Sequence, residues 1–222
     1  MRKLLYVTIL ILSVSSTQAQ GLRLNGYALY TFDDAVSSFQ SNTQFFDGKI
    51  KGGLTWGVGA EFMAQPTLGV EVSYYRMDTK GPVNFFNNGP KSANLDVALN
   101  WIMLGGNKYF GANPKVEPYA GFMLGAGIID VRNPDNGNTQ GSTEFAWGIK
   151  GGVNVWASEK VGIKLQTNLM SMVQAVGGGL FFGTGGASVG VSTFSTLLQF
   201  SLGGGLVFKL GGDAASPAKT VR

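Results

Sequence analysis

The clearest alternation of hydrophobic and polar positions lies in residues 194–210, FSTLLQFSLGGGLVFKL. Side chains along a β-strand point alternately to its two faces. The stretch is longer than the roughly five or six residues usual for a globular strand, but suits a tilted membrane-crossing strand. Its apolar face carries Leu198, Phe200, Leu202, Gly204, Leu206, Phe208 and Leu210, opposite a face of mainly small or polar residues.

Seven further segments alternate in the same way and predict strands at residues 22–33, 53–64, 68–79, 96–110, 117–131, 145–157 and 161–172. We therefore predict an all-β fold, an eight-stranded antiparallel up-and-down transmembrane β-barrel. Large apolar side chains should face lipid, and small or polar ones should face the lumen. In the fourth segment this places Val97, Leu99, Trp101 and Met103 on the lipid face, away from Asp96, Ala98 and Asn100.

The predicted connections alternate in length. Short turns follow the second, fourth and sixth strands, and longer loops are expected at residues 34–51, 80–95, 132–144 and 174–193. Outer-membrane barrels have short periplasmic turns and longer extracellular loops, so both mature termini are expected in the periplasm. A soluble β-sandwich or lipocalin-like barrel also alternates at period two. This alternative is disfavoured because the polar faces of a soluble protein would face water. Each polar face here carries only one or two charged residues, which is few for a water-exposed surface.

The first residues predict a signal peptide at residues 1–19. Arg2 and Lys3 precede an apolar run at residues 4–14, and small residues follow before Gln20. A membrane anchor is the alternative, but the run is shorter than the ~20 residues that a spanning helix needs. We assign residues 20–210 to the barrel and residues 211–222 to a disordered periplasmic tail.

Composition narrows the function. The chain has 34 glycines and only 14% charged residues, against about 25% in a typical soluble protein. It contains no cysteine and no histidine, which excludes thiol chemistry, a Ser-His triad and histidine metal sites. We predict no catalytic, cofactor-binding or metal-binding residues, no cofactor and no enzymatic activity. Four of the basic residues lie in the predicted signal and tail, so the barrel itself is nearly neutral. Its net charge therefore indicates no nucleic-acid partner.

The predicted lumen face holds charges of both signs. Because buried charges are tolerated only when paired, we predict a polar network that fills the narrow interior of an eight-stranded barrel. A gated or selective pore is the alternative interpretation, and acid-base catalysis by Glu61 and Glu71 is strongly disfavoured. The network residues are Arg23, Glu61, Glu71, Glu117, Lys150, Lys164 and Gln166.

One loop is a candidate for binding a partner, and the aromatic residues are candidates for contact with the membrane interfaces. The loop at residues 175–193 is glycine-rich and apolar, and could form a lid, a hairpin or a partner-binding surface. Its candidate interaction residues are Leu180, Phe181 and Phe182. Aromatic girdles at the two membrane interfaces are predicted from Tyr30, Phe32, Tyr74, Tyr75, Trp101, Tyr109, Phe110, Tyr119, Phe145, Trp147, Trp156 and Phe208.

Three segments, LGVEVSYYR (residues 68–76), VEPYAGFMLGAGI (residues 116–128) and the closing FSLGGGLVFKL, carry a family resemblance. With the signal, they make the chain resemble the OmpA-like small outer-membrane β-barrel family of Gram-negative bacteria, in the form common in Bacteroidota. The resemblance implies a location in the bacterial outer membrane, contact with its lipids and lipopolysaccharide, and insertion by the barrel-assembly machinery. That machinery commonly reads a terminal aromatic residue; Phe208 fits, although a tail follows it.

Three functional hypotheses follow. The leading one is a non-enzymatic structural barrel whose external loops bind a protein partner, as an accessory subunit of an envelope complex. The alternative is a small pore or conduit for small or hydrophobic molecules, similar to OmpW-type barrels. A lipid-modifying enzyme is disfavoured by the absence of histidine.

Overall fold

The computed structural model describes residues 21–40, 45–86, 90–111, 113, 115–173, 179–183, 186–190 and 196–210. The predicted signal peptide and tail lie outside the described residues. No helix in the described part of the chain is long and apolar enough to cross a membrane. The strands are β1 (Leu22–Thr31), β2 (Asp34–Gln40), β3 (Phe45–Ile50), β4 (Gly53–Gln65), β5 (Leu68–Phe86), β6 (Pro90–Tyr109), β7 (Val116–Arg132), β8 (Thr139–Trp156), β9 (Val161–Val173), β10 (Gly179–Gly183), β11 (Gly186–Gly190) and β12 (Thr196–Leu210).

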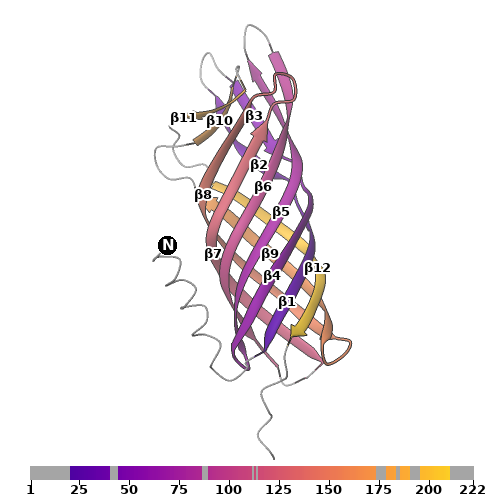
Figure 1. Cartoon of the computed structure of the whole chain (residues 1–222). Helices are drawn as coiled ribbons and strands as arrows, with labels where there is room; N and C mark the ends of the chain where they lie inside the picture. The colour runs from indigo at the N-terminus through magenta and orange to yellow at the C-terminus, as the bar shows by residue number, and fades with distance from the viewer. Residues whose placement is uncertain are drawn as a thin grey trace, which may run out of the picture.

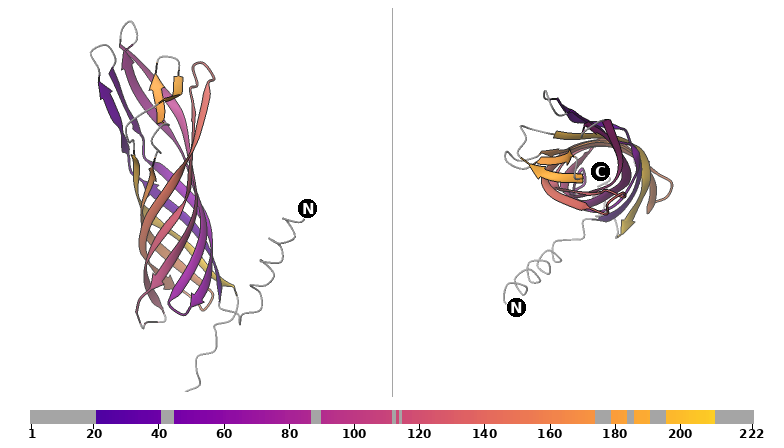
Figure 2. Two further views of the ribbon diagram at one scale, coloured as in Figure 1. Left: turned by 90° about the vertical axis from the view of Figure 1, so that its left-hand side faces the viewer. Right: turned by 90° about the horizontal axis from the view of Figure 1, so that it is seen from above.

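Eight of these strands close into an antiparallel barrel in the order β1-β4-β5-β6-β7-β8-β9-β12 (Figure 1). The first and last strands complete the ring, with pairs running from Leu22 opposite Leu210 to Thr31 opposite Ser201. Seen along its axis, the barrel is a continuous ring (Figure 2). Closure leaves no sheet edge within the barrel wall, as a lipid-embedded sheet requires. The predicted fold class is confirmed.

The two ends of the barrel differ. At one end, here called the turn end, β1 begins, β12 ends and short turns join β4 to β5 and β8 to β9. At the other, the extended end, strands rise well beyond β1, β9 and β12 (Figure 2). The prediction of a loop at residues 80–95 is wrong, because β5 and β6 remain paired to Phe86 and Pro90.

Other predicted loops also contain strands. The segment at residues 34–51 holds the β2–β3 hairpin, β8 begins at Thr139, and β10 and β11 form a separate hairpin. These segments alternate weakly in sequence. Their strand structure comes from backbone hydrogen bonds to a neighbouring strand, which a one-dimensional pattern does not reveal.

The outer surface of the barrel is apolar, as predicted. On β12, Phe200, Leu202 and Leu206 are about half exposed, while Gln199, Ser201 and Val207 are buried in the lumen. The same parity holds on β1, β4, β8 and β9. Outward aromatic rings also meet: Phe32 stacks on Phe200, with ring centroids 5.6 Å apart. An apolar belt around a closed barrel is the surface that a bilayer solvates.

The face prediction for β6 is wrong. Trp101 is 0% exposed in the lumen, whereas Ile102 and Leu104 face outward at 50% and 57% exposure. Both faces of this strand are apolar, so its period-two pattern does not distinguish inside from outside. Cross-strand partners do: Trp101 lies between inward Tyr75 of β5 and inward Gly127 of β7. A Cβ atom on Gly127 would lie 2.5 Å from the Met172 side chain, so this glycine makes room for a second large luminal residue. The residues assigned to the wrong face are Val97, Leu99, Trp101 and Met103.

The girdle prediction is wrong at five positions. The rings of Tyr75, Trp101, Tyr109, Tyr119 and Trp156 are buried in the lumen. They share strand parity with other inward side chains, and the narrow interior needs large side chains to fill it. The interior therefore has two parts, a polar part toward the turn end and an apolar part toward the extended end, which includes Leu29, Met77, Val97, Leu99, Trp101, Met103, Met123, Ile129, Val131, Met170 and Met172.

Inward glycines make room for this filling, and adjacent Gly105 and Gly106 of β6 provide a test. A Cβ atom on inward Gly105 would lie 2.6 Å from the Phe122 carbonyl oxygen and 2.9 Å from Met123 Cγ. On outward Gly106 the nearest atom would be 3.9 Å away. We expect Gly105→Ala to destabilise the barrel by about 1–3 kcal/mol through overpacking, and Gly106→Ala by less than about 0.5 kcal/mol. Urea unfolding in lipid vesicles measures both, and equal losses would contradict the assignment of faces.

Candidate functional site

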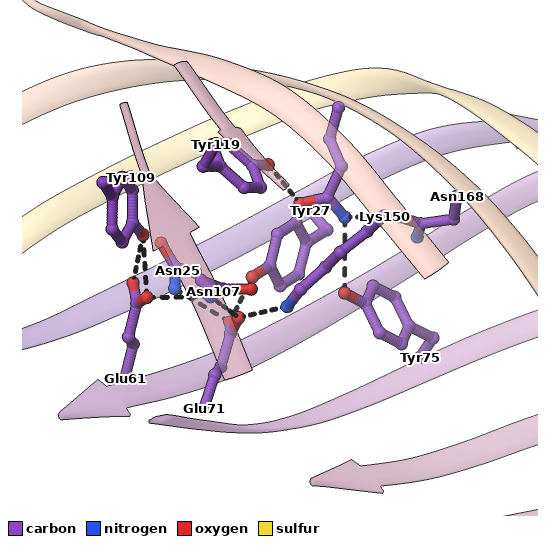
Figure 3. A network of polar contacts seen from close by, with 11 residues as sticks. Asn25, Tyr27, Glu61, Glu71, Tyr75, Asn107, Tyr109, Tyr119, Lys150 and Asn168 are labelled. Carbon is purple, nitrogen blue, oxygen red and sulfur yellow. Dashed lines mark hydrogen bonds and ion pairs between the residues drawn. The ribbon is translucent and has the colours of Figure 1, made fainter. Parts of the chain in front are cut away.

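The polar part of the lumen is organised around Glu71 on β5 (Figure 3). Asn25 Nδ2 donates to its Oε1 at 2.8 Å, and Asn107 Nδ2 donates to its Oε2 at 2.9 Å. The Tyr27 hydroxyl also donates to Oε1. Lys150 Nζ lies 2.5 Å from Oε2, and both side chains of this ion pair are fully buried. The Glu71 carboxylate thus has a cation and three neutral donors, the conditions under which a buried charge is stable.

A second buried carboxylate, Glu61, lies directly opposite Glu71 on β4. The Tyr109 hydroxyl is 2.7 Å from both oxygens of Glu61, and Asn107 Nδ2 donates to its Oε1 at 2.8 Å. Asn107 therefore bridges the two acids. Two like charges on facing residues would repel each other, and this shared amide together with Lys150 offsets the repulsion.

Arg23 on β1 links the network to the turn end. Its Nη1 lies 2.9 Å from Glu117 Oε2, and its Nη2 donates to Oε1 at 3.3 Å. The guanidinium carbon is 4.7 Å from the Tyr109 ring centroid and 5.3 Å from that of Trp156. A planar guanidinium suits both contacts, since it can bind a carboxylate through two nitrogens while stacking on aromatic rings.

Lys164 and Gln166 lie on β9, across the lumen. The Tyr119 hydroxyl donates to Gln166 Oε1 at 2.5 Å, and Gln166 Nε2 donates to Asn168 Oδ1 at 2.9 Å. The ammonium of Lys164 lies 4.6 Å from the Tyr119 ring centroid and, among the described residues, has no hydrogen-bond partner. The Lys164 ammonium therefore lies against an aromatic ring, whereas the Lys150 ammonium is paired with a carboxylate.

All seven residues expected in the network lie in this part of the lumen, and their formal charges balance: Arg23, Lys150 and Lys164 against the three glutamates. Sequence analysis missed Tyr27, Asn107 and Tyr109. Strand parity was a usable signal for Tyr27, which is two residues from inward Asn25. It was not usable for Asn107 and Tyr109, because both lie on β6, whose two apolar faces hide which side is inward. Within the described residues, no group of acidic side chains is arranged to hold a metal ion.

The candidate interaction residues lie on β10, where Leu180 pairs with Val189, Phe181 with Ser188 and Phe182 with Ala187. Their side chains, and the remainder of the loop, lie outside the described residues. Of the three forms expected for this loop, the described part adopts a hairpin, made of β10 and β11.

A hollow of about 480 Å³ lies at the extended end, along β5, β6, β7 and β8. Salt bridges join Lys80 to Asp96 and Arg76 to Asp78 on this part of the wall. The hollow is lined by Asp78, Thr79, Lys80, Asp96, Val97, Ala98, Asp130, Val131, Arg132 and Thr139.

A clamp at Asp33, beyond the apolar belt, fixes the base of the β2–β3 hairpin. Lys49 Nζ and the Gly52 backbone N–H each donate to its carboxylate at 2.7 Å, and the hydrogen bond from Lys49 is the main cause of a lowered pKa of Asp33. Because the pKa of Asp33 is lowered in the folded protein, the clamp stabilises the fold at pH values above the ordinary aspartate pKa. This stabilisation is lost as the pH falls through the pKa of Asp33 in the folded state. We expect the Gly52 amide NMR shift to follow the protonation of Asp33, with a midpoint below the ordinary value of 3.8. Asp33→Asn should abolish the titration, and a midpoint above the ordinary value would contradict the clamp.

A closed eight-stranded barrel with an apolar belt and a packed, charge-balanced lumen defines an integral outer-membrane β-barrel. The chain matches the model of the outer membrane protein beta-barrel domain over residues 5–193, and it belongs to this family. The comparison with curated proteins gives no match.

Solved structures share the fold at low sequence identity. Neisserial surface protein A has a TM-score of 0.56 and 16% identity, over 85% of this chain and 97% of that one. OprG from Pseudomonas aeruginosa has a TM-score of 0.59 and 12% identity, over 88% and 98%. The outer membrane protease OmpT from Escherichia coli has a TM-score of 0.52 and 7% identity, over 88% and 100%. Such identities indicate the fold and carry no function.

Proposed function

We propose that this protein is a non-enzymatic outer-membrane barrel with a closed lumen, whose extended end binds a protein partner outside the cell. The observation that carries the proposal is the filled interior. The buried Lys150–Glu71 ion pair, the partly buried Arg23–Glu117 pair and their hydrogen bonds occupy the lumen at the turn end. Fully buried Tyr75 and Trp101 occupy it farther along. Strand hairpins rising from this rigid base offer a surface for a partner, such as another subunit of an envelope complex. The absence of histidine agrees with a non-enzymatic role.

The proposal includes an orientation. With an even number of barrel strands, both ends of the barrel segment lie at the turn end, which we assign to the periplasm. The extended end then projects outward from the bacterial outer membrane, among lipopolysaccharide. The barrel-assembly machinery would insert the protein with β12 as its closing strand.

Planar-bilayer recording tests the closed lumen. We expect the purified protein to show no unitary conductance, because no water-filled path follows the axis of a packed eight-stranded barrel. Glu71→Ala should lower stability without opening a path, since the apolar filling remains. Reproducible unitary conductance by the wild-type protein would overturn the closed-lumen proposal.

A conduit for hydrophobic molecules is the second candidate. Methionine side chains are adaptable and suit promiscuous apolar sites, and five of them lie in the apolar part of the lumen. Transport of a hydrophobic dye across proteoliposomes, faster than across protein-free vesicles, would favour this candidate over a purely structural barrel. The five are Met77, Met103, Met123, Met170 and Met172.

A further inference from the structure

The upper part of β8 is paired on one side only, among the residues that the structure describes. Residues 139–144 pair with β7 in unbroken register, from Arg132 opposite Thr139 downward. The pairing of β8 with β9 begins at Phe145, opposite Val173. The β10–β11 hairpin lies near β8, yet β11 forms its ladder with β10 (Figure 1). Residues 139–144 therefore form a described strand edge at the extended end.

The hydrogen-bonding direction along this edge follows from β8 itself. At the turn end the Trp156 N–H donates toward β7, to Lys115 O, and the next N–H, of Ala157, donates toward β9, to Val161 O. Successive residues of a strand direct their backbone groups to opposite sides. Because the register with β7 is unbroken, Thr139, Gly141 and Thr143 direct their N–H and C=O groups away from β7, to the side where the described residues provide no partner strand.

This edge, as far as the structure describes it, carries little of the usual protection against strand addition. Natural edges are blunted with lysine and other charged residues, proline or bulges. Residues 139–144 read TQGSTE, keep a regular register and carry only the charge of half-buried Glu144. A row of outward backbone donors and acceptors is complementary to one kind of partner, an extended polypeptide strand.

The hollow beside the edge specifies the charge of that strand. On the outer face, Asp130 lies opposite Gly141 and Arg132 lies opposite Thr139. A Cβ atom on Gly141 would be 2.8 Å from Asp130 Oδ1, so the missing side chain leaves this carboxylate uncovered. Lys80 and Asp96 pair with each other, while Asp130 and Arg132 are exposed and form no salt bridge within the described residues.

We propose that the edge of β8 at residues 139–144 binds an extended strand of a partner protein by antiparallel strand addition, with the charge pattern basic-x-acidic. The basic residue lies opposite Gly141 and reaches Asp130, and the acidic residue lies opposite Thr139 and reaches Arg132. Two side chains on one face of a strand are about 6.6 Å apart along it, the same spacing as Asp130 and Arg132. This proposal rests on the proposed partner-binding function and names its surface and ligand class.

Two other occupants fit less well. The chain's own segment from Gln174 to Ser195 contains no charged residue, so it offers no counter-charge to Asp130 and Arg132. A second copy in the same membrane presents its β8 running in the same direction across the bilayer, whereas antiparallel pairing needs the opposite direction. A partner strand is subject to neither constraint.

Amide hydrogen exchange of the full-length protein in lipid nanodiscs tests the proposal, with a synthetic peptide as probe. The probe is nine residues of alternating threonine and valine with a central Lys-Val-Glu. We expect it to slow exchange at Gly141 and Thr143 at least tenfold. The same peptide N-methylated at alternate residues should give no protection, because it keeps the side chains but cannot complete the ladder.

Matched variants separate backbone pairing from side-chain contact. Thr143→Pro removes an outward N–H and should abolish probe binding, since an edge tolerates proline where the N–H faces solvent. Thr143→Ala keeps that N–H and should bind normally. Asp130→Asn should weaken binding about two- to fivefold, the usual range for an exposed ion pair, and a Glu-Val-Lys probe should bind more weakly than Lys-Val-Glu.

Three results would overturn the proposal. One is the absence of protection by the Lys-Val-Glu probe. Another is equal binding to the Thr143→Pro and Thr143→Ala variants. The third is protection of Gly141 and Thr143 before any peptide is added, which would identify the chain itself or, if concentration-dependent, a second copy as the occupant. None of these results changes the bilayer recording, so the strand-addition and closed-lumen proposals can fail independently.

Discussion

Replacing Lys150 with methionine is expected to destabilise the folded barrel by about 3–5 kcal/mol. The substitution preserves the volume and length of the side chain but removes the cation that lies 2.5 Å from Glu71 Oε2. Both side chains are fully buried, so the Glu71 carboxylate would remain without a counter-charge at hydrogen-bonding distance. Breaking one half of a buried ion pair carries a penalty of this size. Urea unfolding in lipid vesicles, followed by tryptophan fluorescence, measures it.

The matched control is the double variant Lys150→Met with Glu71→Gln. It removes both charges together, and replacing a whole buried ion pair costs far less than breaking it. We expect the double variant to recover about 1–3 kcal/mol relative to the sum of the two single changes. Additive losses would mean that Lys150 and Glu71 do not interact as the structure places them.

Replacing Trp101 with alanine is expected to cost about 3–5 kcal/mol. Trp101 is fully buried in the apolar part of the lumen, and truncating a large core side chain loses its contacts and leaves a cavity. Ile102 is the neighbouring control, because it is half exposed on the outer face. Ile102→Ala should cost less than about 1.5 kcal/mol, since lipid can fill the space that the side chain leaves.

This comparison also tests the inside-outside assignment of β6. If Ile102→Ala were more damaging than Trp101→Ala, the tryptophan would face lipid, as the sequence pattern alone predicted. The same urea titration and fluorescence measurement apply, with Trp56, Trp147 and Trp156 reporting on unfolding when Trp101 is absent.

Much of the barrel was predictable because lipid imposes a simple rule. On β12 the side chains of Leu202 and Leu206 face the bilayer and those of Gln199 and Ser201 face the lumen, so apolar positions largely alternate with small or polar ones. The charged luminal residues followed from the same rule, since Glu71 and Lys150 occupy inward positions and must be compensated. A polar network was therefore predictable from residue type and parity, without knowing which atoms meet.

The pairing of those atoms was not predictable. Glu71 meets Lys150, 79 positions along the chain, and Asn107 bridges two carboxylates because β6 brings it beside them. Tyr109 and Tyr119 look like interface aromatics in sequence, yet they hydrogen-bond within the lumen. The same side chain suits either place, and only the parity of its strand within the closed barrel decides between them.

The sequence by itself determined the number of barrel strands, the closed antiparallel class and the lipid-facing side of most of these strands, because each depends on alternation that water and lipid enforce locally. The tertiary structure decided which apolar face of β6 fills the lumen, how far the hairpins extend and which luminal charges pair. These depend on neighbours from distant parts of the chain. Gly127, opposite Trp101 on β6, makes room for Met172 of β9, and β5 and β6 stay paired as far as Phe86 and Pro90. Such contacts form only when the strands close into a barrel, so no local pattern records them.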